Sequence, residues 1–205
     1  MNLKNQFEQL CSSFTEDPQL IRDLWKEIET KYSEKGRYYH NLLHLENMLN
    51  ELEYVKSNIS DVTAISFSVF YHDIIYDASS KSNEEKSAAK AEKRLTELHI
   101  NQDKISLISA QILATKSHQR SDDEDTNYLL DADLSVLGKD FKTYSEYTQN
   151  IRKEYSIYPD FLYKPGRKKV LKHFLELESI FKTEYFKEKY EVQAKENIAA
   201  ELQLL

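Results

Sequence analysis

Cysteine, glycine and proline are all scarce in this chain. Its 205 residues include one cysteine, three glycines and three prolines. The single cysteine, Cys11, cannot form an intrachain disulfide, so the sequence carries no sign of an oxidising compartment. Because the tight turns of a β-sandwich depend on glycine and proline, their scarcity favours helices.

Long hydrophobic runs and excess positive charge are also missing. The N-terminus has no signal-peptide pattern, and no segment approaches the roughly 20 apolar residues of a membrane span. The formal net charge of -7 disfavours non-specific binding to a phosphate backbone, which depends on lysine and arginine. We therefore expect a cytoplasmic protein that binds neither a membrane nor a nucleic-acid polymer. A small phosphorylated ligand in a locally basic pocket stays compatible with this charge.

What is present is helical periodicity. Apolar residues recur at helical spacing along almost the whole chain, and its length suits one domain. Asp17-Pro18 and Ser60-Asp61 are typical of helix N-termini. The helix after Asp61 is apolar on most sides, which predicts a central position. We therefore predict an all-α helical bundle. The oligomeric state is open, with a homodimer among the alternatives.

Three segments of the second half interrupt this periodicity. Residues 116–126 are polar and predict a loop. Residues 128–137 predict a short helix, with Gly138 just past its end. Residues 157–166 contain two prolines and a glycine, which predict irregular chain.

Histidine and aspartate residues stand out against the apolar pattern. His40 and His44 lie four residues apart, so on a helix they share one face. His72 and Asp73 end the apolar run "AISFSVFYHD". An ionised carboxylate in such surroundings needs a partner, either a charged side chain or a metal ion.

A further pair of carboxylates, Asp131 and Asp133, lies in a leucine-rich turn. Each of these signals is weak alone, because a lone histidine or an acidic helix face is common without any ligand. Imidazole and carboxylate together suit Mn²⁺, Fe²⁺, Zn²⁺ or Ni²⁺. Adjacent helical residues point about 100° apart, so His72 and Asp73 can reach one ion only if it lies between their directions.

The order His40, His72-Asp73, Asp133 resembles the HD superfamily of metal-dependent phosphohydrolases. Six segments resemble a subgroup of predicted HD hydrolases, and together they cover about residues 37–175. These segments are "RYYHNLLHLENML", "FYHDIIYD", "NEEKSA", "ILATKSH", "DADLSVLG" and "IRKEYSIYPDFLYKPGRKKVLKHFL".

The resemblance implies one compact all-α domain of the HD type over residues 1–205. Its core would span about residues 37–175, with helices in 1–33 and 176–205 packed on it. It implies that His40, His72, Asp73 and Asp133 bind a divalent ion, which could be manganese, nickel, magnesium, zinc or iron. Asp131 would then lie behind the ligands or contact substrate, and which of Asp131 and Asp133 binds directly is open.

Two further histidines are candidates beside this ligand set. Some members of the superfamily hold a second metal ion with additional histidines, which makes His118 a possible ligand. The alternative is an exposed loop histidine. His44 is expected to contact substrate or to have a structural role.

The remaining candidates concern the phosphate and proton transfer. Arg37 lies about one helical turn before His40, where related hydrolases place an arginine that faces the substrate phosphate; the alternative is a surface ion pair. Asp77 is a candidate proton shuttle. Glu84 either faces the site or only interacts with the helix dipole.

A second wall of the site is expected near residues 158–166. Arg152, Tyr155 and Arg167 flank this segment and could bind substrate, with core packing as the alternative for Tyr155.

The sequence therefore predicts an enzyme, a metal-dependent phosphohydrolase acting on a small phosphorylated compound, possibly a nucleotide. One alternative is a non-catalytic HD module that binds a nucleotide. Another is a di-iron HD-fold oxygenase, for which His44 and His118 would decide.

Overall fold

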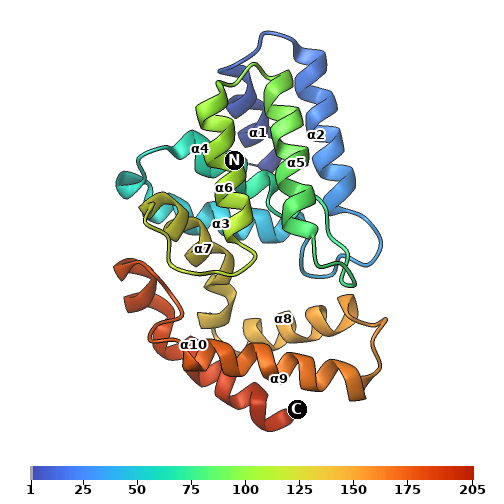
Figure 1. The fold of residues 1–205 in the computed structure, drawn as a ribbon, viewed down its shortest axis with the longest axis vertical. Helices are drawn as coiled ribbons and strands as arrows, with labels where there is room; N and C mark the ends of the chain where they lie inside the picture. Colours follow the sequence, from blue (N-terminus) through green and yellow to red (C-terminus); the bar gives the residue numbers. More distant parts are fainter. Residues whose placement is uncertain (1) are drawn as a thin grey trace.

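A computed structural model describes residues 2–205, which form a single all-α domain (Figure 1). No strand occurs in this range, as the scarcity of turn residues predicts. None of the helices in residues 2–205 combines the length and hydropathy needed to cross a lipid bilayer. The elements are α1 (Leu3–Ser12), α2 (Pro18–Tyr32), α3 (Leu42–Tyr54), the 3-10 helix η1 (Lys56–Asn58), α4 (Val62–Tyr71), α5 (Asn83–Glu97), α6 (Gln102–Ala114), α7 (Glu124–Leu134), the 3-10 helix η2 (Ser135–Gly138), α8 (Phe141–Glu154), α9 (Asp160–Glu176) and α10 (Glu184–Leu204).

Two predicted helix starts are confirmed. The Asp17 carboxylate accepts hydrogen bonds from two backbone N–H groups in the first turn of α2, whose first residue is Pro18. The Asp61 carboxylate accepts from the backbone N–H of Ala64 at the start of α4. Such caps satisfy N–H groups that have no partner within the helix.

The central position of α4 is also confirmed. Most of its side chains are buried, and it packs against α3, α5, α6 and α7. Its end therefore delivers His72 and Asp73 to the middle of the molecule rather than to its surface.

The prediction of irregular chain at 157–166 is wrong, because α9 begins at Asp160 and runs through Pro165 and Gly166. Proline removes one hydrogen bond of the helix, here to the carbonyl of Phe161. Phe161 is 75% exposed, so the first turns of α9 lie at the surface of the molecule. The helix is therefore tolerated where the composition predicted a loop.

The segment before Gly138 also differs from its prediction. Residues 124–126, expected in a loop, already belong to α7, whose first turn is capped by Asp123. The α-helix ends at Leu134 and continues as η2. Gly138 touches the backbone of Tyr190 in α10, where no Cβ atom would fit.

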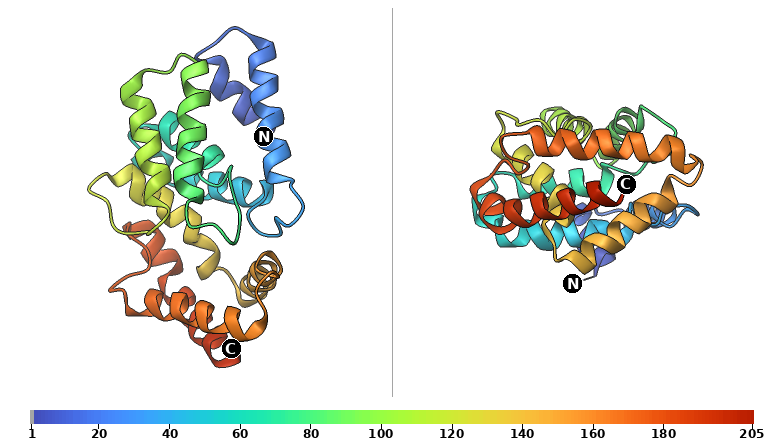
Figure 2. Two further views of the ribbon diagram at one scale, coloured as in Figure 1. Left: turned by 45° about the vertical axis from the view of Figure 1, so that its right-hand side comes forward. Right: turned by 90° about the horizontal axis from the view of Figure 1, so that it is seen from below.

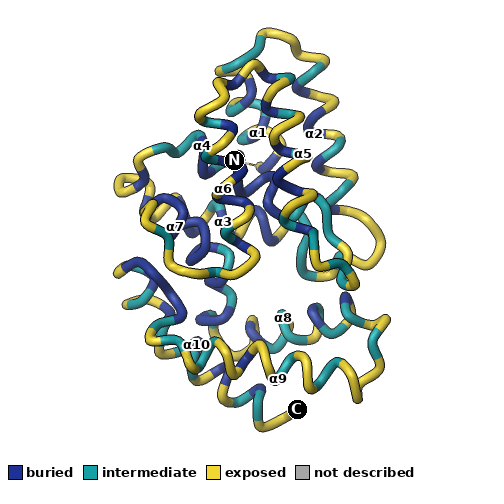
Figure 3. Tube along the Cα trace, viewed as in Figure 1, coloured by how far each residue is buried: buried dark blue, intermediate teal, exposed yellow. Residues whose placement is uncertain are grey.

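The helices form an upper, a middle and a lower group. In Figure 1, α1, α2, α5 and α6 stand upright above, and α3 and α7 lie between them and the lower group. Helix α4 crosses at the height of α1, and we count it with the middle group because it packs against α3 and α7. The lower group consists of α8, α9 and α10, which lie across the base when the molecule is seen from below (Figure 2). Buried residues are concentrated within the upper and middle groups, whereas α9 is exposed or half-buried along most of its length (Figure 3). The chain passes from the middle to the lower group through η2.

Candidate metal centre

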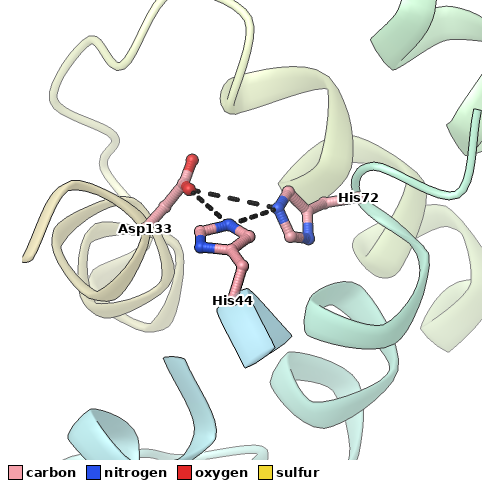
Figure 4. A group of neighbouring side chains, drawn as sticks. All are labelled: His44, His72 and Asp133. Carbon is pink, nitrogen blue, oxygen red and sulfur yellow. Dashed lines mark hydrogen bonds and ion pairs between the residues drawn. The ribbon is translucent and has the colours of Figure 1, made fainter. Parts of the chain in front are cut away.

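Three side chains from three helices of the middle group converge. His44 comes from α3, His72 follows the last residue of α4, and Asp133 comes from α7 (Figure 4). The two Nε2 atoms lie 3.3 Å apart, and Oδ1 of Asp133 lies 3.1 Å from His44 Nε2 and 4.0 Å from His72 Nε2. One potential ligand atom of each residue thus faces the same point. We call His44, His72 and Asp133 the triad.

Local structure fixes the orientation of these rings. His72 Nδ1 lies 2.9 Å from the carbonyl oxygen of Val69, one turn earlier. Because a carbonyl only accepts, Nδ1 carries the hydrogen, and Nε2 of the neutral ring presents a lone pair to the triad. His44 lies in the first turn of α3, which is capped by the side chain of Asn41. A hydrogen-bond partner behind a histidine, such as the Val69 carbonyl behind His72, is typical of metal ligands.

Two further side chains extend the cluster. Oδ2 of Asp73 lies 3.2 Å from His72 Nε2 and 3.9 Å from His40 Nε2. His118 Nε2 lies 2.8 Å from Oδ2 of Asp133. His118 adopts a φ of 49° in the turn after α6, a conformation that few non-glycine residues adopt. Each oxygen of Asp133 therefore faces a different histidine.

The donor set fits a divalent ion. Ligand atoms that bind one ion at about 2.1 Å and at right angles lie about 3 Å apart. The spacings of 3.1, 3.2 and 3.3 Å within the cluster are close to this value. Nitrogen and carboxylate donors suit manganese, iron, zinc or nickel better than they suit calcium. His44, His72 and Asp133 would hold such an ion, with Asp73 beside it.

The cluster holds two carboxylates that stay ionised. Burial raises the pKa of Asp73 and of Asp133, but the adjacent histidines outweigh burial and hold the pKa of both carboxyls below the usual range. Burial lowers the pKa of His72, but the charge of Asp73 outweighs it and raises this pKa to about 9. Burial dominates at His44 and lowers its pKa. Protonated histidines or a divalent metal cation can balance the two ionised carboxylates.

His40 occupies a different place from the one that the sequence implied. Its Nδ1 lies 2.6 Å from Oε2 of Glu154, and its Nε2 points toward Asp73 rather than joining the triad. Burial lowers the pKa of His40, but the hydrogen bond to Glu154 outweighs burial and raises it. The triad instead includes His44, which the sequence assigned to substrate contact or structure.

Glu154, on α8, is a site residue that sequence reasoning missed. Its Oε1 accepts hydrogen bonds from the backbone N–H groups of residues 38, 39 and 40 at 2.7–2.9 Å. Its Oε2 also accepts from the Tyr76 hydroxyl. These partners lie 78 to 116 residues away in the chain, so no local motif could have indicated them.

Arg37 is bound to the backbone rather than free for a phosphate. Its guanidinium donates to the carbonyl oxygens of His40, Asp73 and Ile74. The chain segments that carry His40 and Asp73 are thereby held together. In contrast with the sequence prediction, Arg37 supports the site from behind.

Two predicted carboxylates also lie elsewhere. Asp131 is fully buried, and its oxygens accept from the backbone N–H groups of Lys182 and Thr183 and from the Thr183 hydroxyl. It anchors the start of α10 and does not reach the triad. Asp77 is exposed and bonds to Ser79 within its own loop.

A cavity of about 950 Å³ separates the middle group from α8 and α9. His40, His118 and Asp133 line its inner end, so one member of the triad opens to it. Glu84 lines it too, in agreement with one of the two alternatives for this residue. The site is therefore accessible to a ligand larger than an ion.

The residues predicted for the second wall divide into two kinds. Tyr155 and Arg167 line the cavity, although Arg167 is bound through its guanidinium to both oxygens of Glu201. Arg152 does not belong to the lining; it binds Asp160 and backbone carbonyl oxygens. Lys169, which sequence reasoning did not single out, lines the cavity and makes no ion pair within residues 2–205.

In comparisons with known proteins, no family model, no curated protein and no solved structure matches this chain.

Proposed function

We propose that the protein is a metal-dependent phosphohydrolase of the HD type, acting on a small phosphorylated compound. The observation that carries the proposal is the convergence of His44, His72 and Asp133 beside a cavity that can admit a substrate. Asp73 and His118 next to the triad provide the mixed nitrogen and oxygen donors that hydrolytic metal ions use. When bound, the ion would polarise a phosphoryl oxygen and lower the pKa of water.

His40 is the best placed residue to donate a proton. It lines the cavity, and Glu154 holds its Nδ1, so its Nε2 faces the inner end. In hydrolysis a water oxygen forms the new P–O bond, and the ester P–O bond breaks. The leaving oxygen keeps the electron pair and takes the proton from His40, which regains a proton from the attacking water. Phosphate and the free alcohol are the products.

Substrate phosphate would be held without Arg37. Lys169 lines the cavity, and no acidic side chain of residues 2–205 forms an ion pair with it. It is thus available for an anionic substrate, whereas Lys116 and Arg167 are paired with Glu85 and Glu201.

Elemental analysis combined with a panel of phosphate esters tests the proposal. The purified protein should contain a divalent transition metal and hydrolyse at least one ester in the panel. Asp133→Asn and Asp73→Ala should stay folded and lose both metal and turnover. Asp77→Asn is the matched control, because this carboxylate is exposed and bonds to Ser79 in its own loop, and it should keep both. Full turnover in Asp133→Asn would show that the triad takes no part in the reaction.

A di-iron oxygenase is the second candidate, and one observation favours it. His44 faces one oxygen of Asp133 and His118 faces the other, an arrangement in which one carboxylate could bridge two ions. Two irons per chain, a visible absorption band and oxygen uptake would select this function. One manganese, nickel or zinc ion per chain without oxygen uptake would select the hydrolase.

A further inference from the structure

One side of α9 carries three lysines that the proposed reaction does not use. Lys164, Lys168 and Lys172 follow one another at a spacing of four residues, so they lie on the same side of the helix. We call these three residues the lysine stripe. None of them lines the cavity, although the same helix contributes Lys169 to it. The stripe is therefore a separate surface from the candidate metal centre.

The positive charge of the lysine stripe is not balanced within the protein. None of the three lysines forms an ion pair within residues 2–205. The two acidic residues of α9 do not compensate them, because Asp160 is paired with Arg152, and Glu176, the last residue of the helix, makes no ion pair with the stripe. A chain of net charge -7 thus presents a local excess of positive charge. Such a face is complementary to an anionic partner.

Large apolar side chains are exposed next to the stripe, where α8 turns into α9. Ile157 is 69% exposed and Phe161 is 75% exposed, and this turn projects at the right-hand edge of the lower group in Figure 1. We call Ile157 and Phe161 the apolar tip. Phe161 lies about one turn before Lys164, on the side of α9 that carries the stripe. A groove would suit a peptide, whereas a protruding apolar pair beside lysines suits the headgroup layer of a bilayer.

We propose that the lysine stripe and the apolar tip dock the protein on the surface of an anionic lipid bilayer. The apolar tip enters the headgroup layer, and the lysines attract the anionic headgroups around it. Lysine suits this role because its point charge on a flexible stem needs no fixed geometry, whereas arginine is favoured for the bidentate recognition of nucleic acids. Lys164 and Lys168 are half-buried, and their stems can extend the ammonium groups to the bilayer.

This inference does not rest on the proposed hydrolase function, and it differs from the expectation that the net charge gave. The net charge of -7 predicts no attraction of the molecule as a whole to an anionic surface. Attraction to a bilayer falls off within a Debye length, about 10 Å at 0.1 M salt. The charges nearest the surface therefore decide it, and on this face of α9 they are positive.

Vesicle flotation tests the lysine stripe. The protein is mixed with vesicles of phosphatidylcholine alone or of phosphatidylcholine with about one third phosphatidylserine, in about 0.1 M salt. It should bind only the anionic vesicles, and about 1 M salt should release it because the charges are then screened. Replacement of Lys164, Lys168 and Lys172 together by glutamine should weaken binding about 100-fold, since each lysine near the surface contributes about fivefold.

A second triple variant controls for the change in net charge. Lys26, Lys35 and Lys93 are exposed and form no ion pair within residues 2–205, and they lie outside α9. Their joint replacement by glutamine removes the same charge and should leave vesicle binding at the wild-type level. An equal loss in both triple variants would show that net charge rather than the stripe is responsible, and would overturn the proposal.

Tryptophan fluorescence tests the apolar tip. Phe161→Trp should give a blue-shifted emission when anionic vesicles are added, because indole favours the membrane interface. Tyr54→Trp is the matched control and should show no shift, because Tyr54 is 72% exposed on α3, away from the stripe. Trp25 is buried and adds the same background to both variants. Phe161→Ser should weaken vesicle binding about tenfold, whereas Tyr54→Ser should not.

Three results would overturn the bilayer as the partner. They are no binding to anionic vesicles, equal binding to neutral vesicles, and no emission shift in Phe161→Trp. Polyglutamate and RNA are tested beside the vesicles. If either binds the wild type but not the stripe variant, and the vesicles do not bind, this face of α9 docks an acidic protein or a nucleic acid instead. Circular dichroism confirms that each variant is folded before its binding is compared.

Discussion

At the scale of single residues, Glu154 is the most heavily used acceptor in the site. Three backbone N–H groups, the His40 ring and the Tyr76 hydroxyl all donate to its carboxylate. Burial raises the pKa of Glu154, but the hydrogen bond from His40 outweighs burial and lowers it. A buried carboxylate that is fully hydrogen-bonded stays ionised. It therefore holds His40 in one orientation and favours its charged form.

Glu154→Gln is expected to lower turnover about 10- to 100-fold on whichever ester the wild type hydrolyses best. Glutamine keeps the shape of the side chain but loses the charge that faces His40. Because Glu154 does not touch the triad, the metal content should stay at the wild-type level, and the loss should appear in kcat more than in KM. Steady-state kinetics with elemental analysis measure both. Tyr76→Phe, which removes one donor and no charge, should cost far less. Loss of metal in Glu154→Gln would contradict a role through His40.

The sequence identified the residue types of the site better than their roles. His72, Asp73, Asp133 and His118 are brought together. The apolar run before His72 and Asp73 pointed to those two residues, whereas Asp133 and His118 were indicated through the resemblance to the HD superfamily. His40 and His44 lie four residues apart, and this spacing alone does not tell which of them joins the triad. The direction of each ring decides it, and His44 is the one that joins. Asp131 lies two residues from Asp133 yet binds the start of α10, because its partners are supplied by residues 51 and 52 positions later.

At the scale of elements, close approach determines where glycine is needed. Gly138 ends η2 at the point where α10 crosses it, and a Cβ at this position would overlap the backbone of Tyr190. Gly166 lies inside α9, and a Cβ added there would meet no atom within 4 Å. The two glycines therefore have opposite effects on stability, although the sequence suggested an interruption of the helix at both.

Substitution by alanine at these two positions is expected to change stability in opposite directions. Gly138→Ala should lower the free energy of unfolding by about 1–3 kcal/mol, because backbone rather than a flexible side chain must move. Gly166→Ala should raise it by about 0.5–1 kcal/mol, since alanine is the better helix former and has room. Urea denaturation of both variants beside the wild type measures the difference. A neutral Gly138→Ala would mean that η2 and α10 are not in contact in solution.

Element prediction succeeded where a local pattern decides the structure and failed where packing decides it. The caps at Asp17 and Asp61 and the apolar α4 were predictable, because their partners lie within one turn. The helix through Pro165 was not, because proline and glycine locally favour a break. Helix α9 packs against α10 and buries Leu171, contacts that no local pattern of the sequence indicates.

At the scale of the whole molecule, the residues of the site and their supports link helices of the middle group to helices of the lower group. The triad draws one residue each from α3, the end of α4 and α7. Glu154 ties α8 of the lower group to the loop before α3, and Asp131 ties α7 to the start of α10. A cation bound by the triad would therefore stabilise contacts on which both the middle and the lower group depend.

Metal removal is expected to destabilise the entire domain rather than the site alone. A ligand present at 100 times its dissociation constant stabilises the folded state by about 2.7 kcal/mol. For a domain of about 200 residues this corresponds to a shift in Tm of about 5–10 °C. Circular dichroism melts with manganese and with a chelator measure the shift, which should occur in a single transition. Asp133→Asn should melt at the same temperature under both conditions, and Asp77→Asn should respond like the wild type. A wild-type Tm that is unaffected by saturating manganese, zinc, nickel and iron would mean that these helices are held together without an ion.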